Sequence, residues 1–116
     1  VADEFYGTDD VLVDADGATL TAADSGRTIS NEGATAEANF VLPSAAAGYR
    51  FRFVVQDNSG LKVTAAAGDT IRVAGSVTSA AGNISTTTIG NFVELIAINA
   101  TEWIATQTVG TWTVSA

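Results

Sequence analysis

The chain has no histidine and no cysteine among its 116 residues, and these absences exclude the commonest catalytic arrangements. Without an imidazole there is no Ser-His-Asp or Cys-His set, and without a thiol there is no disulfide framework and no thiolate metal site. The single lysine, Lys62, lies in an alternating segment with no serine placed to form a Ser-Lys pair. Paired carboxylates remain, but exposed carboxylates stay ionised, whereas a general acid needs burial to raise its pKa. We therefore expect no enzymatic activity.

A metal-binding motif is also missing, although one segment imitates it. Asp14-Ala15-Asp16-Gly17 has the opening of a calcium-binding EF-hand loop. The Asp or Asn ligand that should follow Asp16 is absent, and Ser25 stands where the closing bidentate glutamate belongs. An Asp-Gly turn between two short strands explains the segment better. We expect no metal and no cofactor.

Long apolar runs are missing too. No stretch approaches the roughly 18 residues that suggest a membrane-spanning helix, and no basic-then-apolar leader opens the sequence. The length predicts one domain. A small residue such as Val1 is a usual N-terminus after methionine removal, so we expect a small gene product made in a cytoplasm.

What the chain does contain is a series of short segments in which apolar and polar residues alternate. Gly, Asn, Asp, Ser or Pro bounds each of them, which is typical of strands separated by turns. Their spacing of about 8 to 12 residues predicts an all-β domain, an antiparallel β-sandwich or barrel that is jelly-roll-like. The alternating segments are 18–21, 27–30, 38–42, 49–55, 61–64 and 70–73. Residues 20–29 and 63–71 also resemble each other, and we interpret both as hairpins that share turn chemistry.

The sequence closes on what reads as a packed antiparallel meander. Residues 92–98 and 101–106 are predicted strands joined by a tight reversal at Asn99-Ala100, and a further reversal or bulge at Val109-Gly110 precedes residues 111–114. Four large side chains are expected to supply core or oligomer contacts: Phe92, Leu95, Trp103 and Trp112. We expect Trp112 in particular to face a neighbouring copy.

Negative charge is concentrated at the start of the chain. Residues 1–37 hold nine acids and one base, whereas the rest of the chain holds four of each. Residues 1–17 are predicted to form an acidic N-terminal arm and residues 18–116 the β-sandwich domain. The arm is either a solvated tail or a segment that docks on a basic surface of a partner. The docking interpretation assigns partner binding to Phe5, Tyr6, Asp9 and Asp10.

Two arginines stand out in the segment Tyr49-Arg50-Phe51-Arg52-Phe53. With a period of two, the aromatic residues face one side and both arginines the other, so the aromatic side chains are expected in the core. A pI of about 4.1 disfavours nucleic acid as the partner. We expect Arg50 and Arg52 to pair with carboxylates, for instance in the acidic arm of another copy, and count both as candidate oligomer-interface residues.

Three stretches of the sequence resemble a small β-domain of tailed-bacteriophage virion proteins. They are residues 19–31, residues 40–55 with the Phe40-Val41-Leu42-Pro43 motif, and the closing residues 93–112 with both tryptophans. The likeness covers roughly residues 18–114. It implies a domain exposed on the virus particle, commonly a trimer, that serves either as a capsid decoration (cement) protein or as the head of a fibre.

Only about 17 residues precede the resembling region, whereas fibre heads usually follow a long shaft. This favours a capsid decoration protein, made in the host cytoplasm and located on the virion, with the major capsid protein and its own copies as partners, as a homotrimer. The alternative is a trimeric receptor-binding knob of a tail or head fibre, with residues 58–60 and 80–88 as loop tips. We expect neither nucleic acid nor membrane as a partner.

Overall fold

A computed structural model describes residues 11–115, which form eleven short strands and one 3-10 turn. The elements are β1 (Val11–Val13), η1 (Ala22–Asp24), β2 (Thr28–Ser30), β3 (Ala38–Val41), β4 (Arg50–Val54), β5 (Leu61–Thr64), β6 (Thr70–Val73), β7 (Ser76–Val77), β8 (Asn83–Thr86), β9 (Phe92–Ala97), β10 (Glu102–Val109) and β11 (Thr113–Val114). No helix in this part of the chain has the length and apolar character needed to cross a membrane.

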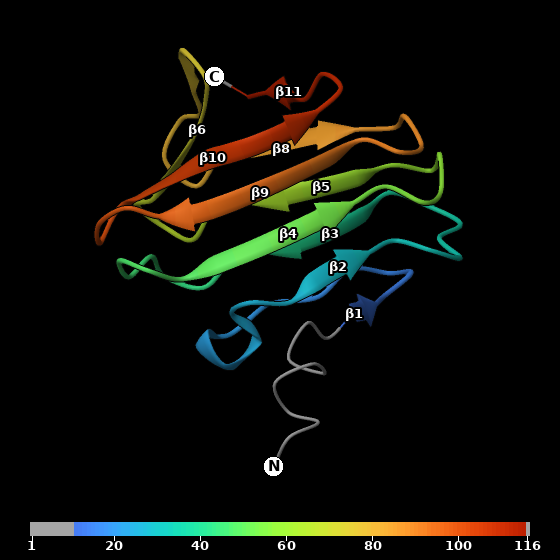
Figure 1. The fold of residues 1–116 in the computed structure, drawn as a ribbon, viewed down its shortest axis with the longest axis horizontal. Coiled ribbons are helices and arrows are strands. Elements are labelled where there is room, and N and C mark those ends of the chain that lie inside the picture. The colour runs from blue at the N-terminus through green and yellow to red at the C-terminus, as the bar shows by residue number, and fades with distance from the viewer. Residues whose placement is uncertain (1–10, 116) are drawn as a thin grey trace.

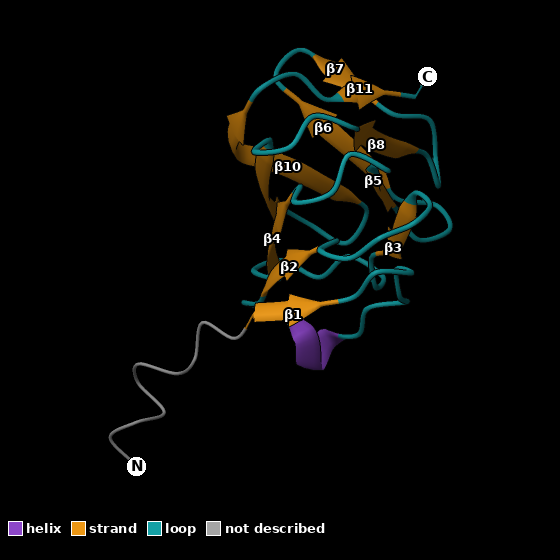
Figure 2. Cartoon of the chain, turned by 90° about the vertical axis from the view of Figure 1, so that its right-hand side faces the viewer, coloured by secondary structure: helices purple, strands orange, loops and turns teal. Residues whose placement is uncertain are grey.

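The strands build two sheets that pack against each other (Figure 1). Sheet A has the order β1-β2-β4-β9-β10-β6-β7, and sheet B has the order β11-β8-β5-β3. Figure 2 shows β4 and β10 on one side of the molecule and β3, β5 and β8 on the other. The prediction of an all-β sandwich is confirmed.

Both sheets are mixed rather than antiparallel. The chain passes back and forth between the sheets from β1 to β6. Strands of one sheet that are separated by a single pass along the other sheet become parallel neighbours: β1 with β2, β2 with β4, and β3 with β5. Thr19 adds a parallel bridge to Val41. The expected antiparallel pairing holds only for five of the nine strand pairs. Alternation has the same period in both kinds of ladder, so it cannot reveal strand direction.

The two similar segments, 20–29 and 63–71, are crossings between sheets and not hairpins. The first leaves the strand-like residue Thr19 beside β3 and enters β2, and the second leaves β5 and enters β6. In the first crossing the backbone N–H of Thr21 donates to Asp24 Oδ2 at 2.9 Å, which closes a capping box around η1. Residues 20–29 and 63–71 therefore each connect a strand of one sheet to a strand of the other.

The closing meander is only partly as predicted. β9 and β10 form the expected antiparallel hairpin, which lies between β4 and β6. The third segment leaves sheet A: at Gly110 the backbone takes a φ of +78°, and β11 pairs with β8 in sheet B. A side chain at Gly110 would overlap the amide of Asn91, so glycine permits both the left-handed conformation and the close approach.

The core lies between the sheets and is centred on aromatic side chains. Phe51 packs with Phe53 and with Trp103, at ring-centroid distances of 6.4 and 5.7 Å, and Phe40 packs with Phe53 at 5.9 Å. All four are fully buried, as the alternation in residues 49–55 predicts for Phe51 and Phe53. Trp112 is also buried in this core.

The predicted arm boundary at residue 17 needs correction. β1 pairs with β2 at the edge of sheet A, and the backbone N–H of Asp14 donates to Ser30 O at 3.0 Å. The Asp14–Gly17 segment is a turn in which Asp14 Oδ1 accepts a hydrogen bond from Asp16 N at 3.0 Å. Residues 11–17 therefore belong to the sandwich, because three backbone pairs with β2 hold them there.

A buried asparagine ties the end of β2 to the turn that follows β4. Asn31 Oδ1 accepts hydrogen bonds from the backbone N–H groups of Gln56 and Asp57, at 2.7 and 3.0 Å. Its Nδ2 donates to the carbonyls of Asp57 and Gly60, at 2.9 and 3.0 Å. The amide thus uses two lone pairs and two protons, which is its complete hydrogen-bonding capacity.

Candidate interaction face

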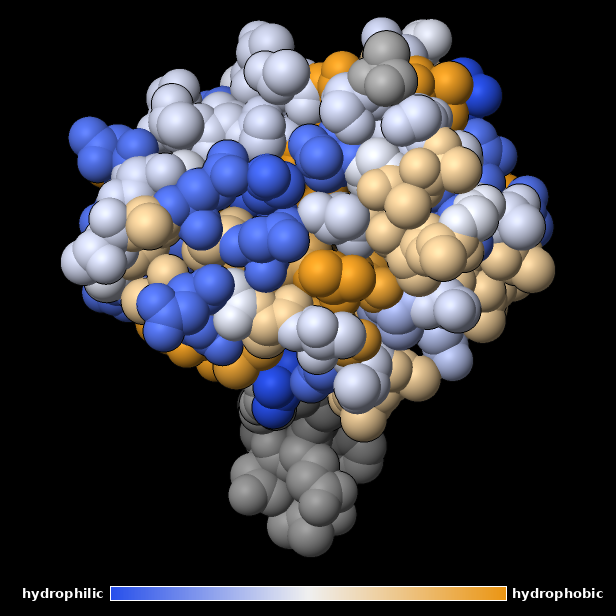
Figure 3. All heavy atoms as spheres, turned by 180° about the vertical axis from the view of Figure 1, so that it is seen from behind, coloured by the Kyte–Doolittle hydropathy of each residue, from blue (hydrophilic) through white to orange (hydrophobic). Residues whose placement is uncertain are grey.

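The outward surfaces of the two sheets differ in chemical character. Sheet B turns polar side chains outward along β3, β5 and β8, including Asn39, Lys62 and Ser85. Thr64 Oγ1 donates to Asn39 Oδ1 at 2.7 Å across two of these strands. Seen from behind, hydrophilic and hydrophobic residues are interspersed over the surface (Figure 3).

Sheet A instead turns a mixture of apolar and arginine side chains outward. Cross-strand pairing aligns them in rows, because outward residues at matched register lie side by side. We call this surface the outer face of sheet A, and its members are Val11, Val13, Arg50, Arg52, Val54, Arg72, Phe92, Glu94, Ile96, Ile104, Gln107 and Val109.

The first row of this face is almost entirely apolar. Register pairs Val13 with Ser30, Ser30 with Val54, Val54 with Phe92, and Phe92 with Val109, across five strands. Val13 and Val109 are each more than half exposed, but Ser30, between Val13 and Val54, is fully buried and donates its hydroxyl to Gln56 Oε1. The contiguous apolar part of the row is therefore Val54, Phe92 and Val109. Exposed apolar side chains that are scattered singly are normal on a protein surface, but a contiguous set marks an interaction site.

The second row runs Val11, Thr28, Arg52, Glu94, Gln107, and its polar part centres on Glu94 in β9. Arg50 Nε and Arg52 Nε lie 3.8 and 3.5 Å from the same oxygen, Glu94 Oε2. Thr106 Oγ1 donates to the other oxygen, Oε1, at 2.8 Å. The register of β10 shifts between Ala105 and Gln107, so a bulge directs the Thr106 hydroxyl toward the carboxylate.

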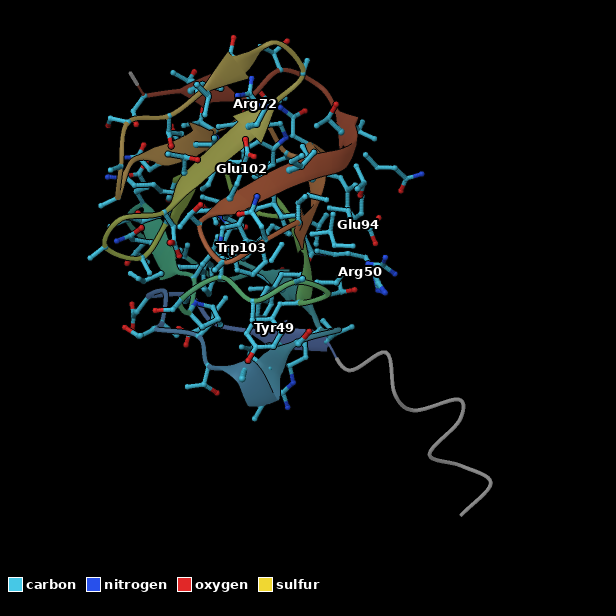
Figure 4. The ribbon with its side chains drawn as sticks, turned by 90° about the vertical axis from the view of Figure 1, so that its left-hand side faces the viewer. Tyr49, Arg50, Arg72, Glu94, Glu102 and Trp103 are labelled. Atoms are coloured by element: carbon cyan, nitrogen blue, oxygen red, sulfur yellow. The ribbon has the colours of Figure 1, made fainter. Side chains whose placement is uncertain are left out.

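The third row places two isoleucines between two arginines. It runs Arg50, Ile96, Ile104, Arg72 from β4 to β6. Arg72 Nε lies 3.0 Å from Glu102 Oε2. Figure 4 shows Arg50 beside Glu94 and Arg72 beside Glu102.

Charge is distributed unequally between this side of sheet A and the remainder. Arg50, Arg52 and Arg72 stand there with Glu94 and Glu102, a net charge of +1. The rest of residues 11–115 holds seven acids and two bases. In a protein of net charge −8, this is the surface on which an acidic segment meets the least repulsion.

The candidates from the sequence have different outcomes. Arg50 and Arg52 come together on one face and pair with a carboxylate, but that carboxylate is Glu94 of the same chain. Trp112 is 5 % exposed, and its Nε1 donates to Phe92 O at 3.1 Å. Of the two roles considered for Trp112, the structure supplies the core one, because the crossing at residue 110 turns the ring between the sheets.

Two further predictions concern the ends of the molecule. Phe5, Tyr6, Asp9 and Asp10 lie outside the described residues. The predicted loop tip at residues 58–60 lies between β4 and β5. The other tip, residues 80–88, is wrong as a loop because it contains strand β8, which pairs with β5.

Sequence reasoning missed Glu94 and the apolar row. Glu94 carries a readable signal, since a lone carboxylate between buried Val93 and Leu95 must face outward. The apolar row has no such signal, because Val13, Val54, Phe92 and Val109 are far apart in the chain and only pairing aligns them.

Within residues 11–115 there is no pocket, and no three acidic residues gather in a way that could hold a metal ion. No protein-family model matches the chain, and no curated protein is significantly similar to it.

Proposed function

We propose that this protein is a structural component of a tailed-phage virion, a decoration protein that binds the outer surface of the head and stabilises contacts between major capsid proteins. The observation that carries the proposal is the difference between the two sheets. One broad face combines apolar rows with arginines, while β5 and β8 on the opposite face turn mainly polar side chains outward. Such a face suits a flat protein partner better than a small molecule, which needs a concave site.

The resemblance over residues 18–114 to virion β-domains supports the same assignment. In this proposal the outer face of sheet A turns toward the particle or toward a neighbouring copy, and Phe5, Tyr6, Asp9 and Asp10 add contacts from the N-terminal segment. Assembly as a homotrimer would let weak contacts of each copy combine, because linked binding events raise the overall avidity.

Binding to purified empty capsids of the phage that encodes the chain tests the proposal, with host cells as the comparison. We expect co-sedimentation with capsids and none with cells. Binding to cells alone would favour the receptor-binding knob instead. Light scattering coupled to size exclusion measures the oligomeric state, for which we expect three copies.

Two matched substitutions test which face is used. Ile104→Lys places a charge on the outer face of sheet A, and Thr64→Lys places the same charge on the outer face of sheet B. We expect the first to weaken capsid binding at least tenfold, since a desolvated lysine in an apolar contact costs more than about 1.4 kcal/mol. The second should leave binding unchanged. Equal effects of the two substitutions would contradict the assignment of the face.

Deletion of residues 1–10 is expected to abolish capsid binding, because it removes Phe5 and Tyr6 together with four carboxylates. Undiminished binding by the shortened chain would exclude the N-terminal segment as a contact.

A further inference from the structure

The third row of the outer face of sheet A has a pattern of charge that one segment of this chain complements. The row presents two isoleucines between two arginines, in the order Arg50, Ile96, Ile104, Arg72. Neighbouring strands lie about 4.8 Å apart, so the backbones of the two arginines are separated by about 14 Å.

Residues 1–10 read VADEFYGTDD: two acids, two aromatic residues, a short spacer and two acids. The acidic pairs are six positions apart, which spans at most about 20 Å in an extended chain. Carboxylates can therefore reach both arginines while Phe5 and Tyr6 lie between them, over the isoleucines. The segment and the row match in sign and in order.

Residues 1–10 are long enough to reach the third row from the point where they join β1. Val11 opens β1 at the edge of the same sheet and shares a row with Thr28 and Arg52. One row further toward the N-terminus of these parallel strands lies the row that contains Arg50. From β1 to β6 there are five strand spacings, about 24 Å, and ten residues span up to about 33 Å.

The arginines can accept this contact without losing the glutamates they hold. Each contact to Glu94 or Glu102 uses the Nε of Arg50 or Arg72, and a guanidinium has five N–H donors. The side chains of Arg50 and Arg72 are 49 % and 41 % exposed, which leaves their other donors open to a second carboxylate.

We propose that in the free protein residues 1–10 fold back across the outer face of sheet A of their own chain, with Phe5 and Tyr6 on Ile96 and Ile104. The tether makes the segment's effective concentration at its own face about millimolar, which favours this face over the same face of a second copy. This goes beyond the proposed function: binding to a partner would exchange the segment for the partner's surface. The test uses the isolated protein, so its failure is independent of capsid binding.

A nitroxide spin label on Ala2→Cys tests the proposal, since the chain has no other cysteine to label. Paramagnetic broadening of backbone amides is measured on the 15N-enriched full chain. We expect several-fold stronger broadening at Ile104 and Ile71, in β10 and β6, than at Thr64 and Ser85 in sheet B. Equal broadening in both sheets would overturn the proposal.

The double variant Arg50→Gln/Arg72→Gln should lose this difference, while Lys62→Gln, which removes a positive charge from sheet B, should keep it. If Arg50→Gln/Arg72→Gln does not fold, added salt tests the same charge attraction in the protein with both arginines present. Raising ionic strength from about 0.15 to 1 M shortens the Debye length from about 8 to 3 Å and should weaken the broadening at Ile104. A pattern unchanged by both charge removal and salt would refute the proposal.

A mixed sample separates the same chain from a second copy. Spin-labelled protein without 15N is combined with 15N-enriched protein without a label. We expect no broadening at Ile104 in this mixture. Broadening there would show that the segment binds a neighbouring copy and would overturn the assignment to its own chain.

Discussion

Replacing Asn31 with aspartate tests how far the fold depends on one buried amide. The substitution keeps the shape and the two acceptor contacts to Gln56 N and Asp57 N, but it removes both donors to the carbonyls of Asp57 and Gly60. Both carbonyls keep a second donor, Gly60 N for Asp57 O and Ala38 N for Gly60 O, so the cost lies in the two lost hydrogen bonds, about 1 kcal/mol each, and in the unpaired buried charge of the carboxylate. We expect a loss of about 3 kcal/mol or more at pH 7, a large part of the roughly 5–15 kcal/mol that stabilises a domain.

The cost of Asn31→Asp should depend on pH in a defined direction. Burial raises the pKa of the new carboxyl above its unfolded value of about 3.9. The neutral acid is tolerated below that value, and it also supplies one donor. The penalty therefore grows as the pH rises through the folded pKa, so the variant should be closer to the parent at pH 4 than at pH 7.

Urea unfolding followed by tryptophan fluorescence measures the loss as a shift in the midpoint at constant slope. Asn58→Asp, two residues before Gly60 on an exposed position, adds the same charge and should change stability by less than about 0.5 kcal/mol. The reasoning is refuted if the two variants lose equal stability, or if the penalty of Asn31→Asp is the same at pH 4 and pH 7.

Three further outcomes follow from single contacts. Gly110→Ala combines a φ of +78° with overlap on Asn91, so we expect a loss of about 2 kcal/mol or more in urea unfolding; an unchanged midpoint would contradict the crossing geometry. Trp103 Nε1 is the only buried side-chain polar atom in residues 11–115 without a hydrogen-bond partner, whereas Trp112 Nε1 has one. Trp103→Phe should therefore lose less stability than the roughly 3–5 kcal/mol of aromatic truncations to alanine, and a larger loss would mean that the indole N–H is satisfied. The backbone N–H of Ser59 donates to the Asp57 carboxylate and lowers its pKa. The stabilisation from this contact is present above the unfolded pKa and is lost as the pH falls through the folded pKa. Asp57→Asn should therefore show a weaker decline in urea midpoint below pH 4 than the parent, and parallel declines would argue against the contact.

Part of the candidate face could be predicted from the sequence. The opposite orientation of Arg50 and Phe51 follows from a local period of two, and the structure agrees with it. The partner of Arg50 could not be predicted, because Glu94 lies 44 positions later and reaches it only through the pairing of β4 with β9. The same holds for the apolar row, which exists only once five strands share a register.

The proposed exchange of the N-terminal segment for a partner would have a simple physical role. A face that combines Val54, Phe92 and Ile104 with arginines is prone to unwanted association when uncovered. A tethered acidic segment would cover part of it until a larger partner surface displaces the segment.

The amino-acid sequence was enough to predict an all-β protein and to show which strand residues point inward. Both properties depend on the alternation of apolar and polar residues and on turn residues, which are patterns among residues that are neighbours in the sequence. Tertiary structure alone decided that β2 and β4 run parallel, that β11 leaves its neighbour β10 for the other sheet, and that Trp112 is enclosed. Those outcomes depend on how the connections pass between the sheets, and parallel and antiparallel strands have the same side-chain period.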